Sequence, residues 1–240
     1  MLKRIIIILI LVIGFFFLQL FIRAGQFKTI VNKPAGEVVA VYRNLPGPED
    51  MQADYVLHKM FIAAANRRPA NTNAKPDGIY VLDLTSMTPP HRLETTYAKD
   101  LHPHGLSLWR EDTLLYLYVV NHIEEGDFVE KFLYTGNDTL QHLASYSSPL
   151  MCCLNDVAAT GPSSFYATND HGSRAGLSRK MEDYLNIGRA SVVYFDGSQY
   201  HKVARHLNYA NGIYYDRKHD KLYVATTTGK ALLSFTIEAD

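Results

Sequence analysis

Apolar residues follow two patterns along the chain, and the first is a single long run near the N-terminus. Residues 5–22 are almost continuously apolar, and Lys3 and Arg4 precede them. About 18 helical residues at about 1.5 Å each span roughly 27 Å, close to the hydrocarbon thickness of a bilayer. The run therefore predicts a transmembrane helix. By the positive-inside rule, Lys3 and Arg4 stay in the cytoplasm and the remaining chain is exported to the periplasm or the exterior.

A cleaved signal peptide is the alternative interpretation of this run. Its apolar region normally has about 7 to 15 residues and ends at a small-x-small cleavage site. The run here is longer, and residues 21–25 (FIRAG) contain no clean site. We therefore expect residues 1–25 to be a membrane anchor and residues 26–48, which are punctuated by Pro and Gly, to be a linker.

The second pattern is a series of short apolar and aromatic segments that end in small or polar residues. Four of them resemble one another, at 60–66, 115–122, 164–170 and 221–227. Further strand-like segments follow at 78–84, 129–135, 190–197 and 231–237. Such a repeat, roughly every 50 residues, is typical of β-propeller blades, because one sheet cannot bury both faces until neighbouring sheets stack against it.

The repeat predicts an all-β fold, a propeller with about four blades over residues 49–240. A two-sheet sandwich also contains short alternating strands, but it gives no reason for the repeat. Little helix is expected in this region. The exception is residues 177–185, where apolar residues follow helical spacing.

Charge and cysteine content narrow the function classes. Lys plus Arg equals Asp plus Glu at 24 each, so no broad basic surface attracts nucleic acid, and a nucleic-acid partner is disfavoured. The two cysteines, Cys152 and Cys153, are adjacent, and neighbouring residues rarely reach disulfide geometry. We interpret them as small buried side chains, with a reactive thiol or an intermolecular pair as the alternatives.

Polar residues gather at the ends of the predicted inner strands, which converge on the central channel of a propeller. They are Glu49-Asp50, His102, His104, Asn121-His122, Asn155-Asp156, Asn169-Asp170-His171 and Asn211. Carboxylate and amide oxygens dominate this set, which suits a hard cation such as Ca²⁺. A zinc site at the two nearby histidines lacks a third nitrogen or sulfur ligand at convincing spacing. The GPSSF segment at 161–165 is not a GxSxG elbow, which disfavours a serine nucleophile.

Five motifs together resemble the serum paraoxonase and arylesterase family. They are GPED at 47–50, HPHGLSLW at 102–109, VVNH at 119–122, LNDVAATGPSSFYATNDH at 154–171 and YANGI at 209–213. The family belongs to the six-bladed propellers that include gluconolactonases and strictosidine-synthase-like proteins, and the resemblance covers roughly residues 36–240. It implies a hydrolase of lactones and carboxylic (aryl) esters with two calcium ions in a central tunnel. Because it also implies six blades, we expect a C-terminally truncated chain whose open strand edges allow self-association.

The resemblance also implies roles for individual residues. The positions that match ligands of the catalytic calcium are Glu49, Asn155 and Asn211. Those that match the structural calcium are Asp50, Asp156 and the backbone carbonyl of Leu106. His104 and His122 match a histidine pair proposed as general base and partner, in keeping with the titration range of histidine. The family's catalytic calcium takes further oxygens from an Asp-Asn pair in a later blade, which is not part of these 240 residues.

Two other functions stay open at this point. A calcium-binding propeller without catalysis would be a binding module, and strictosidine-synthase-like chemistry would make the protein a condensing enzyme. A hydrolase predicts calcium-dependent esterase activity that is lost on His104→Gln, whereas a binding module predicts ion-dependent stability without turnover. The expected partners are a small lactone or ester and, through the N-terminal helix, a membrane.

Overall fold

The computed structural model describes residues 1–31, 33, 35–43, 45–67 and 75–237. The chain divides into two compact units, Met1–Val41 and Tyr42–Asp240. The domain limits expected at residues 25 and 48 stay predictions.

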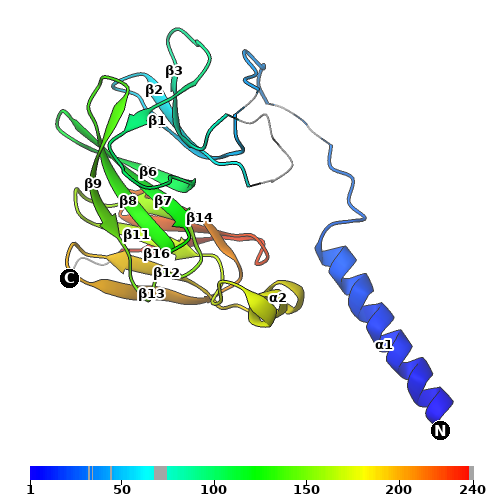
Figure 1. Ribbon diagram of the computed structural model, residues 1–240. Helices are drawn as coiled ribbons and strands as arrows, with labels where there is room; N and C mark the ends of the chain where they lie inside the picture. The colour runs from blue at the N-terminus through cyan, green and yellow to red at the C-terminus, as the bar shows by residue number, and fades with distance from the viewer. Residues whose placement is uncertain (32, 34, 44, 68–74, 238–240) are drawn as a thin grey trace. The chain divides into compact units, whose positions relative to one another are not determined.

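The first unit contains helix α1, Leu2–Arg23, which coincides with the long apolar run (Figure 1). Its mean hydropathy reaches 3.2 over 18 residues, and none of its residues is buried. The helix is therefore long and apolar enough to cross a bilayer, a property that secretory signal sequences share.

The second unit contains four sheets, each built mainly from strands that are consecutive in the chain (Figure 1). The first sheet consists of β1 (Pro48–Asp54), β2 (Lys59–Ala64), β3 (Gly78–Asp83) and β4 (His91–Arg92). The second consists of β6 (Pro103–Glu111), β7 (Leu114–Ile123), β8 (Gly126–Tyr134), β9 (Thr139–Tyr146) and the parallel edge strand β5 (Glu94–Thr95). The third consists of β10 (Leu154–Ala159), β11 (Phe165–Asn169), β12 (Ala190–Phe195) and β13 (Tyr200–Leu207). The fourth consists of β14 (Ala210–Asp216), β15 (Lys221–Thr226) and β16 (Ala231–Thr236).

These four sheets are blades of a propeller, which confirms the predicted all-β fold. The innermost strands are β1, β6, β10 and β14, since each lies at one edge of its sheet and contacts the corresponding edge strand of a neighbouring sheet. The sequence repeat corresponds instead to the second and third strands of the blades. The repeat therefore marks strands one position out from the innermost ones, although Glu49, His104, Asn155 and Asn211 lie on the innermost strands. The reason is that true innermost strands such as β1, PEDMQAD, lack the long apolar stretch that the repeat detects.

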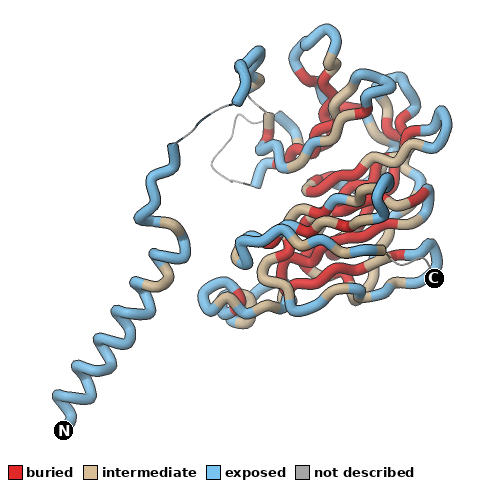
Figure 2. Tube along the Cα trace, turned by 180° about the vertical axis from the view of Figure 1, so that it is seen from behind, coloured by how far each residue is buried: buried red, intermediate tan, exposed pale blue. Residues whose placement is uncertain are grey.

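Neighbouring residues of one strand pack into different cores. On β7, Leu117 packs with Phe61 between the first two blades, whereas Tyr118 packs with Phe165 between the second and third. Because side chains alternate along a strand, both faces of these middle blades are buried, which explains their continuous apolar sequences. Figure 2 shows buried residues running along these strands. Burying one such side chain contributes about 1.5–3 kcal/mol.

The first and last blades differ in how their outer faces are covered. Tyr42 packs against a cluster that includes Ile62 and Tyr80 on the outer face of the first blade. On the last blade, Tyr214 and Leu232 are 57% and 69% exposed. Apolar side chains of the described fourth blade therefore remain accessible to water on one face.

Helix α2, Gly176–Leu185, confirms the helix expected at 177–185 and connects β11 to β12. It ends at Asn186, whose φ of 55° is the left-handed conformation that commonly terminates helices. Its buried residue, Glu182, accepts a hydrogen bond from the amide of Gly172 at 2.8 Å. This contact ties the helix to the segment that follows β11.

Candidate active site

The innermost strands share an irregular pairing near their first residues. Register shifts lie between Pro48 and Asp50, between Pro103 and Leu106, between Leu154 and Val157, and between Ala210 and Ile213. Most of the residues singled out in the sequence fall within these four irregularities. β-Bulges are common beside active sites because the extra residue redirects a side chain out of the regular alternation. The polar motifs of the four blades therefore lie at the same kind of irregularity in strand pairing.

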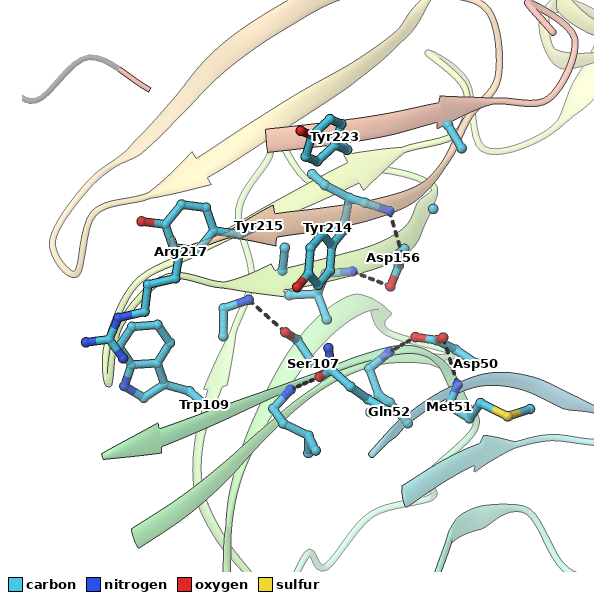
Figure 3. A pocket seen from close by; sticks show the side chains of 18 of the residues that line it. Asp50, Met51, Gln52, Ser107, Trp109, Asp156, Tyr214, Tyr215, Arg217 and Tyr223 are labelled. Carbon is cyan, nitrogen blue, oxygen red and sulfur yellow. Dashed lines mark hydrogen bonds between the residues drawn. The ribbon is translucent and has the colours of Figure 1, made fainter. Parts of the chain in front are cut away.

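Asp50 and Asp156 form a half-buried pair of carboxyl groups from different blades (Figure 3). The Oδ2 atom of Asp50 accepts a hydrogen bond from the amide of Leu106 at 2.8 Å, and Oδ2 of Asp156 accepts one from Ile213 at 2.8 Å. Burial raises the pKa of Asp50, although the amides of Leu106 and Met51 oppose the rise. Burial also raises the pKa of Asp156 well above its usual value, and the charge of Asp50 raises it further.

Gly105 allows this pair to approach the second blade. A Cβ atom at this position would lie 2.2 Å from Oδ1 of Asp156 and 2.8 Å from the carbonyl oxygen of Asn155. Both distances are far shorter than a van der Waals contact, so only glycine fits without displacement. The glycine of the HPHG motif thus serves the carboxyl pair rather than a turn.

The expected ligands of a catalytic calcium have separate contacts. Oε1 of Glu49 lies 3.0 Å from Nε of Arg67, and Oε2 lies 3.6 Å from Nε2 of His104. Asn155 is 5% exposed. Nδ2 of Asn211 donates a hydrogen bond to Oγ1 of Thr227 at 2.9 Å.

The donor chemistry of these residues fits a hard cation. Within the described chain, no group of three or more His, Cys, Asp and Glu side chains is placed to hold a metal. Amide, carbonyl and paired carboxyl oxygens are nevertheless ligands that Ca²⁺ accepts. A cation between Asp50 and Asp156 would offset the repulsion that raises the pKa of Asp156.

His104 and His122 are brought together, as the sequence led us to expect of partners. Nδ1 of His104 lies 3.0 Å from Nε2 of His122, and Nδ1 of His122 lies 2.8 Å from Oδ1 of Asp127. The carboxylate fixes the proton of His122 on Nδ1, which leaves Nε2 to accept from His104. The free nitrogen of a neutral His104 is then Nε2, on the side of Glu49.

The surroundings of His104 and Asp127 lower the pKa values of both groups. Burial lowers the pKa of His104 to about 3, and the positive charges of Arg67 and His122 act in the same direction. Burial raises the pKa of Asp127, but the hydrogen bond and charge of His122 and the amide of Leu154 outweigh it, so the net pKa is lowered. A neutral imidazole and an ionised carboxylate therefore face His122 near neutral pH.

Asp127 is the residue of this site that the sequence analysis did not identify. It pairs directly with His122 across the β7–β8 hairpin, and its Oδ1 also lies 3.0 Å from Nη2 of Arg174. The signal was present in NHIEEGDF, because a tight hairpin around Glu124 and Glu125 places His122 opposite Asp127. Arg67 and Arg174 lie in loops, and no local sequence pattern indicated that they would reach this site.

The other two histidines considered in the sequence lie outside the His104–His122 contact. Nδ1 of His102 is 2.7 Å from Oδ2 of Asp77. His171 is buried between two carboxylates, with Nδ1 at 2.7 Å from Asp170 and Nε2 at 2.8 Å from Asp183 on α2. His171 thus connects helix α2 to the end of β11.

Among the cavities that border these groups, two contain the residues singled out above. One of about 310 Å³ is lined by His104, His122 and Asp127 together with Arg67, Cys153, Asp170, Arg174 and Arg179. The other, of about 530 Å³, contains Asp50 and Asp156 at one end, whereas Arg217 lies over the ring of Trp109, 4.6 Å from its centroid, at the other (Figure 3). The smaller cavity holds the titratable groups suited to proton transfer, so we take it as the candidate active site.

Curated proteins resemble the chain over much of its length. Serum paraoxonase/arylesterase 2 from Rattus norvegicus is 38% identical over 157 residues, which cover 63% of this chain and 44% of that protein. The protein of the same name from Homo sapiens is also 38% identical, with the same coverage. Serum paraoxonase/lactonase 3 from Mus musculus is 34% identical over 168 residues, covering 68% of this chain and 48% of that protein. The matched region thus spans less than half the length of these relatives.

Solved structures and a family model point to the same group. A gluconolactonase from Xanthomonas campestris superposes with a TM-score of 0.55 at 16% identity, covering 80% of this chain and 58% of that chain, which supports the propeller fold. The model of the family described as Arylesterase matches residues 68–240. That match covers well over half of the chain, and so the protein belongs to the arylesterase family.

Proposed function

We propose that the chain hydrolyses lactones and aryl esters of carboxylic acids, with His104 and His122 as its proton-transfer pair. The observation that carries this proposal is the hydrogen-bonded series His104, His122 and Asp127 at the wall of a cavity. Membership of the arylesterase family supports ester chemistry, and the printed names of its relatives include a lactonase. Both substrate types contain the same reacting group, an ester carbonyl.

The proposed reaction begins with neutral His104. A water molecule attacks the carbonyl carbon and gives a proton to Nε2 of His104, while Nδ1 of His104 passes its proton to Nε2 of His122. Asp127 stabilises the positive charge on His122. The proton then returns to the leaving alkoxide oxygen, so that water and ester become a carboxylic acid and an alcohol, joined in one molecule when the substrate is a lactone.

Because its pKa is low, His104 is a weak base on its own. Its contact with His122, which in turn contacts Asp127, offsets this weakness. A proton on His104 lies close to Arg67, whose charge opposes it. A proton on Nε2 of His122 makes an imidazolium whose Nδ1 faces the ionised Asp127 at 2.8 Å, and this carboxylate stabilises the positive charge. Asp127 therefore stabilises the charge once it has passed from His104 to His122.

We also propose that the chain holds Ca²⁺. Asp50, Asp156 and the carbonyl of Leu106 would bind one ion, and a second would be bound by Glu49, Asn155 and Asn211. Support comes from the oxygen-rich donor set and from the raised pKa values of the carboxyl pair. A bound calcium ion acts as a Lewis acid that polarises an ester carbonyl and stabilises negative charge on its oxygen.

The location of the protein follows from helix α1 in this proposal. The helix would be an uncleaved anchor with Lys3 and Arg4 in the cytoplasm, and the propeller would be exported. Mass spectrometry of the mature N-terminus tests this part, because a cleaved signal would remove the helix.

The hydrolase proposal is tested on the full chain purified in detergent. Hydrolysis of phenyl acetate and a panel of lactones is measured with added calcium and with a chelator. We expect calcium-dependent turnover that falls by about 100-fold or more in His104→Gln, the range for loss of a general base. His201→Gln is the matched control, since His201 forms an exposed pair with Asp196. A folded, calcium-stabilised protein without turnover would instead favour the binding module.

A further inference from the structure

Cys152 and Cys153 are in direct contact, although their adjacency in the sequence gave no reason to expect it. Their Sγ atoms lie 3.0 Å apart in the segment between β9 and β10. Cys152 is partly exposed, whereas Cys153 is buried and lines the cavity of His104 and His122. One residue of the pair is therefore partly accessible to solvent, and the other lies at the candidate active site.

The backbone around this pair favours contact between the sulfurs. Cys153 has a φ of 60°, in the left-handed region that non-glycine residues seldom occupy. The sulfurs need to approach by only about 1 Å to reach the bond length of a disulfide, about 2.05 Å. Adjacent Cα atoms are about 3.8 Å apart, shorter than the usual span of about 4.4–6.8 Å across a disulfide. A bond between these residues would therefore be strained and easily reduced.

We propose that Cys152 and Cys153 are a reversible oxidation site, at which peroxide converts the two thiols to a disulfide between adjacent residues. The Cys152 thiolate attacks one peroxide oxygen, the O–O bond breaks, and Cys152 becomes a sulfenic acid as hydroxide leaves. Sγ of Cys153 then attacks this sulfur, the S–O bond breaks, and water leaves. In total, two thiols lose two electrons and two protons, and hydrogen peroxide is reduced to two water molecules.

The first step is assigned to Cys152 because it is the more exposed of the pair. Its hydrogen bond with Cys153 lowers the pKa of the Cys152 thiol to about 7, which increases the fraction present as thiolate at neutral pH. Cys153 is already in contact and is positioned to complete the bond before a second peroxide arrives.

The pair is connected to the groups that hold His122. The carbonyl of Cys153 accepts a hydrogen bond from the amide of Asp170 at 2.9 Å, and the next amide, that of Leu154, donates to Oδ2 of Asp127 at 3.1 Å. Closing a strained ring at Cys153 shifts both contacts. The effect on hydrolysis rests on the proposed function, whereas the oxidation itself does not.

The test uses the full chain and its thiol count. Because the chain contains two cysteines, a disulfide within one molecule can join only this pair. Protein treated with hydrogen peroxide is denatured in N-ethylmaleimide, and its intact mass is measured. We expect two labels before oxidation, none after it, and two again after dithiothreitol. Cys152→Ser and Cys153→Ser, each with one thiol, should form no disulfide within the monomer.

Several results would overturn the proposal, and none requires a variant to fold. They are monomer that keeps both labels after oxidation, added oxygen atoms without disulfide formation, and dimers on a non-reducing gel. Phenyl acetate hydrolysis is measured in parallel, with a several-fold loss expected on oxidation, reversal by dithiothreitol, and no such loss in Cys152→Ser. A confirmed disulfide in a protein without turnover in either state rejects the hydrolase and leaves the oxidation site standing. A confirmed disulfide with unchanged turnover rejects the coupling.

Discussion

Two partly buried polar regions of the propeller differ in how their charges are balanced. In the series of His104, His122 and Asp127, the carboxylate faces an imidazole and Arg174, so opposite charges meet within the chain. In the pair of Asp50 and Asp156, two carboxyl groups face each other and accept hydrogen bonds from backbone amides. The pKa of Asp127 is accordingly lowered, whereas the pKa of each member of the pair is raised.

The contrast indicates that the carboxyl pair, unlike the histidine series, depends on a proton or a cation from outside the polypeptide. The histidine series has donors and acceptors from its own side chains, so it is organised before substrate arrives. The carboxyl pair keeps like charges together in a desolvated site, and this costs stability unless a proton or a cation joins them. The histidine series is thus complete within the chain, whereas the pair offers carboxyl oxygens of the kind that bind hard cations.

The largest expected effect comes from breaking the histidine series at Asp127. Asp127→Asn removes the negative charge and lets His122 adopt the other tautomer, so that proton transfer from His104 is blocked. We expect phenyl acetate hydrolysis to fall by about 100-fold or more at neutral pH. Asp196→Asn is the matched control, because Asp196 contacts an exposed histidine, His201, at 3.0 Å. Unchanged turnover with an unchanged pH profile would show that Asp127 has no such role.

The next effect tests the close packing of the carboxyl pair. Gly105→Ala introduces a Cβ atom 2.2 Å from Asp156, and we expect the free energy of unfolding to fall by about 1–3 kcal/mol or more. Gly212→Ala is the control, because its Cβ atom would lie 3.7 Å from the same carboxyl group, an ordinary contact. Denaturant unfolding of both variants measures the difference. If the two variants were equally stable, the backbone around Gly105 would be able to move and accept the added Cβ atom without cost.

The pH dependence of stability should have opposite signs in the two regions. Without calcium, the raised pKa values of Asp50 and Asp156 give stability that is full below about 3.8 and is lost as pH rises through the folded pKa values. His104, lowered from 6.5 to about 3, gives stability that is present above 6.5 and is lost as pH falls through this window. Unfolding midpoints across this range, in chelator, measure both trends.

Substitutions separate the two trends. Asp50→Asn and added calcium should each reduce the loss at higher pH, and His104→Gln should reduce the loss on acidification. If calcium leaves the high-pH limb unchanged, the carboxyl pair does not bind the ion.

The smallest effect is expected at Arg174. Its side chain is 50% exposed, so its ion pair with Asp127 is screened by water and should contribute at most about 1 kcal/mol. Arg174→Gln should therefore lower turnover by only a few-fold, far less than Asp127→Asn does. A loss equal to that of Asp127→Asn would mean that Arg174 acts on the substrate directly.

Much of the fold was determined by the sequence itself. The apolar run at 5–22 and the repeat of strand-like segments are local patterns, and they predicted helix α1 and the blades because alternation and helical spacing are properties of short stretches. The motifs likewise singled out His104, His122, Asp50 and Asp156 by residue type. Even the pairing of His122 with Asp127 was implicit in a tight hairpin.

The tertiary structure decided which strands are innermost and which groups meet there. Leu106 and Asp50 are 56 residues apart, and their contact depends on how one blade stacks on the next. The bulges turn side chains away from the regular alternation, so a period of two does not reveal their direction. The contact of Cys152 with Cys153 requires a left-handed backbone that the sequence does not display. Residue types and local periodicity can thus be read directly from the sequence. The balance of charges among buried side chains and the contacts between distant segments arise only when the blades pack.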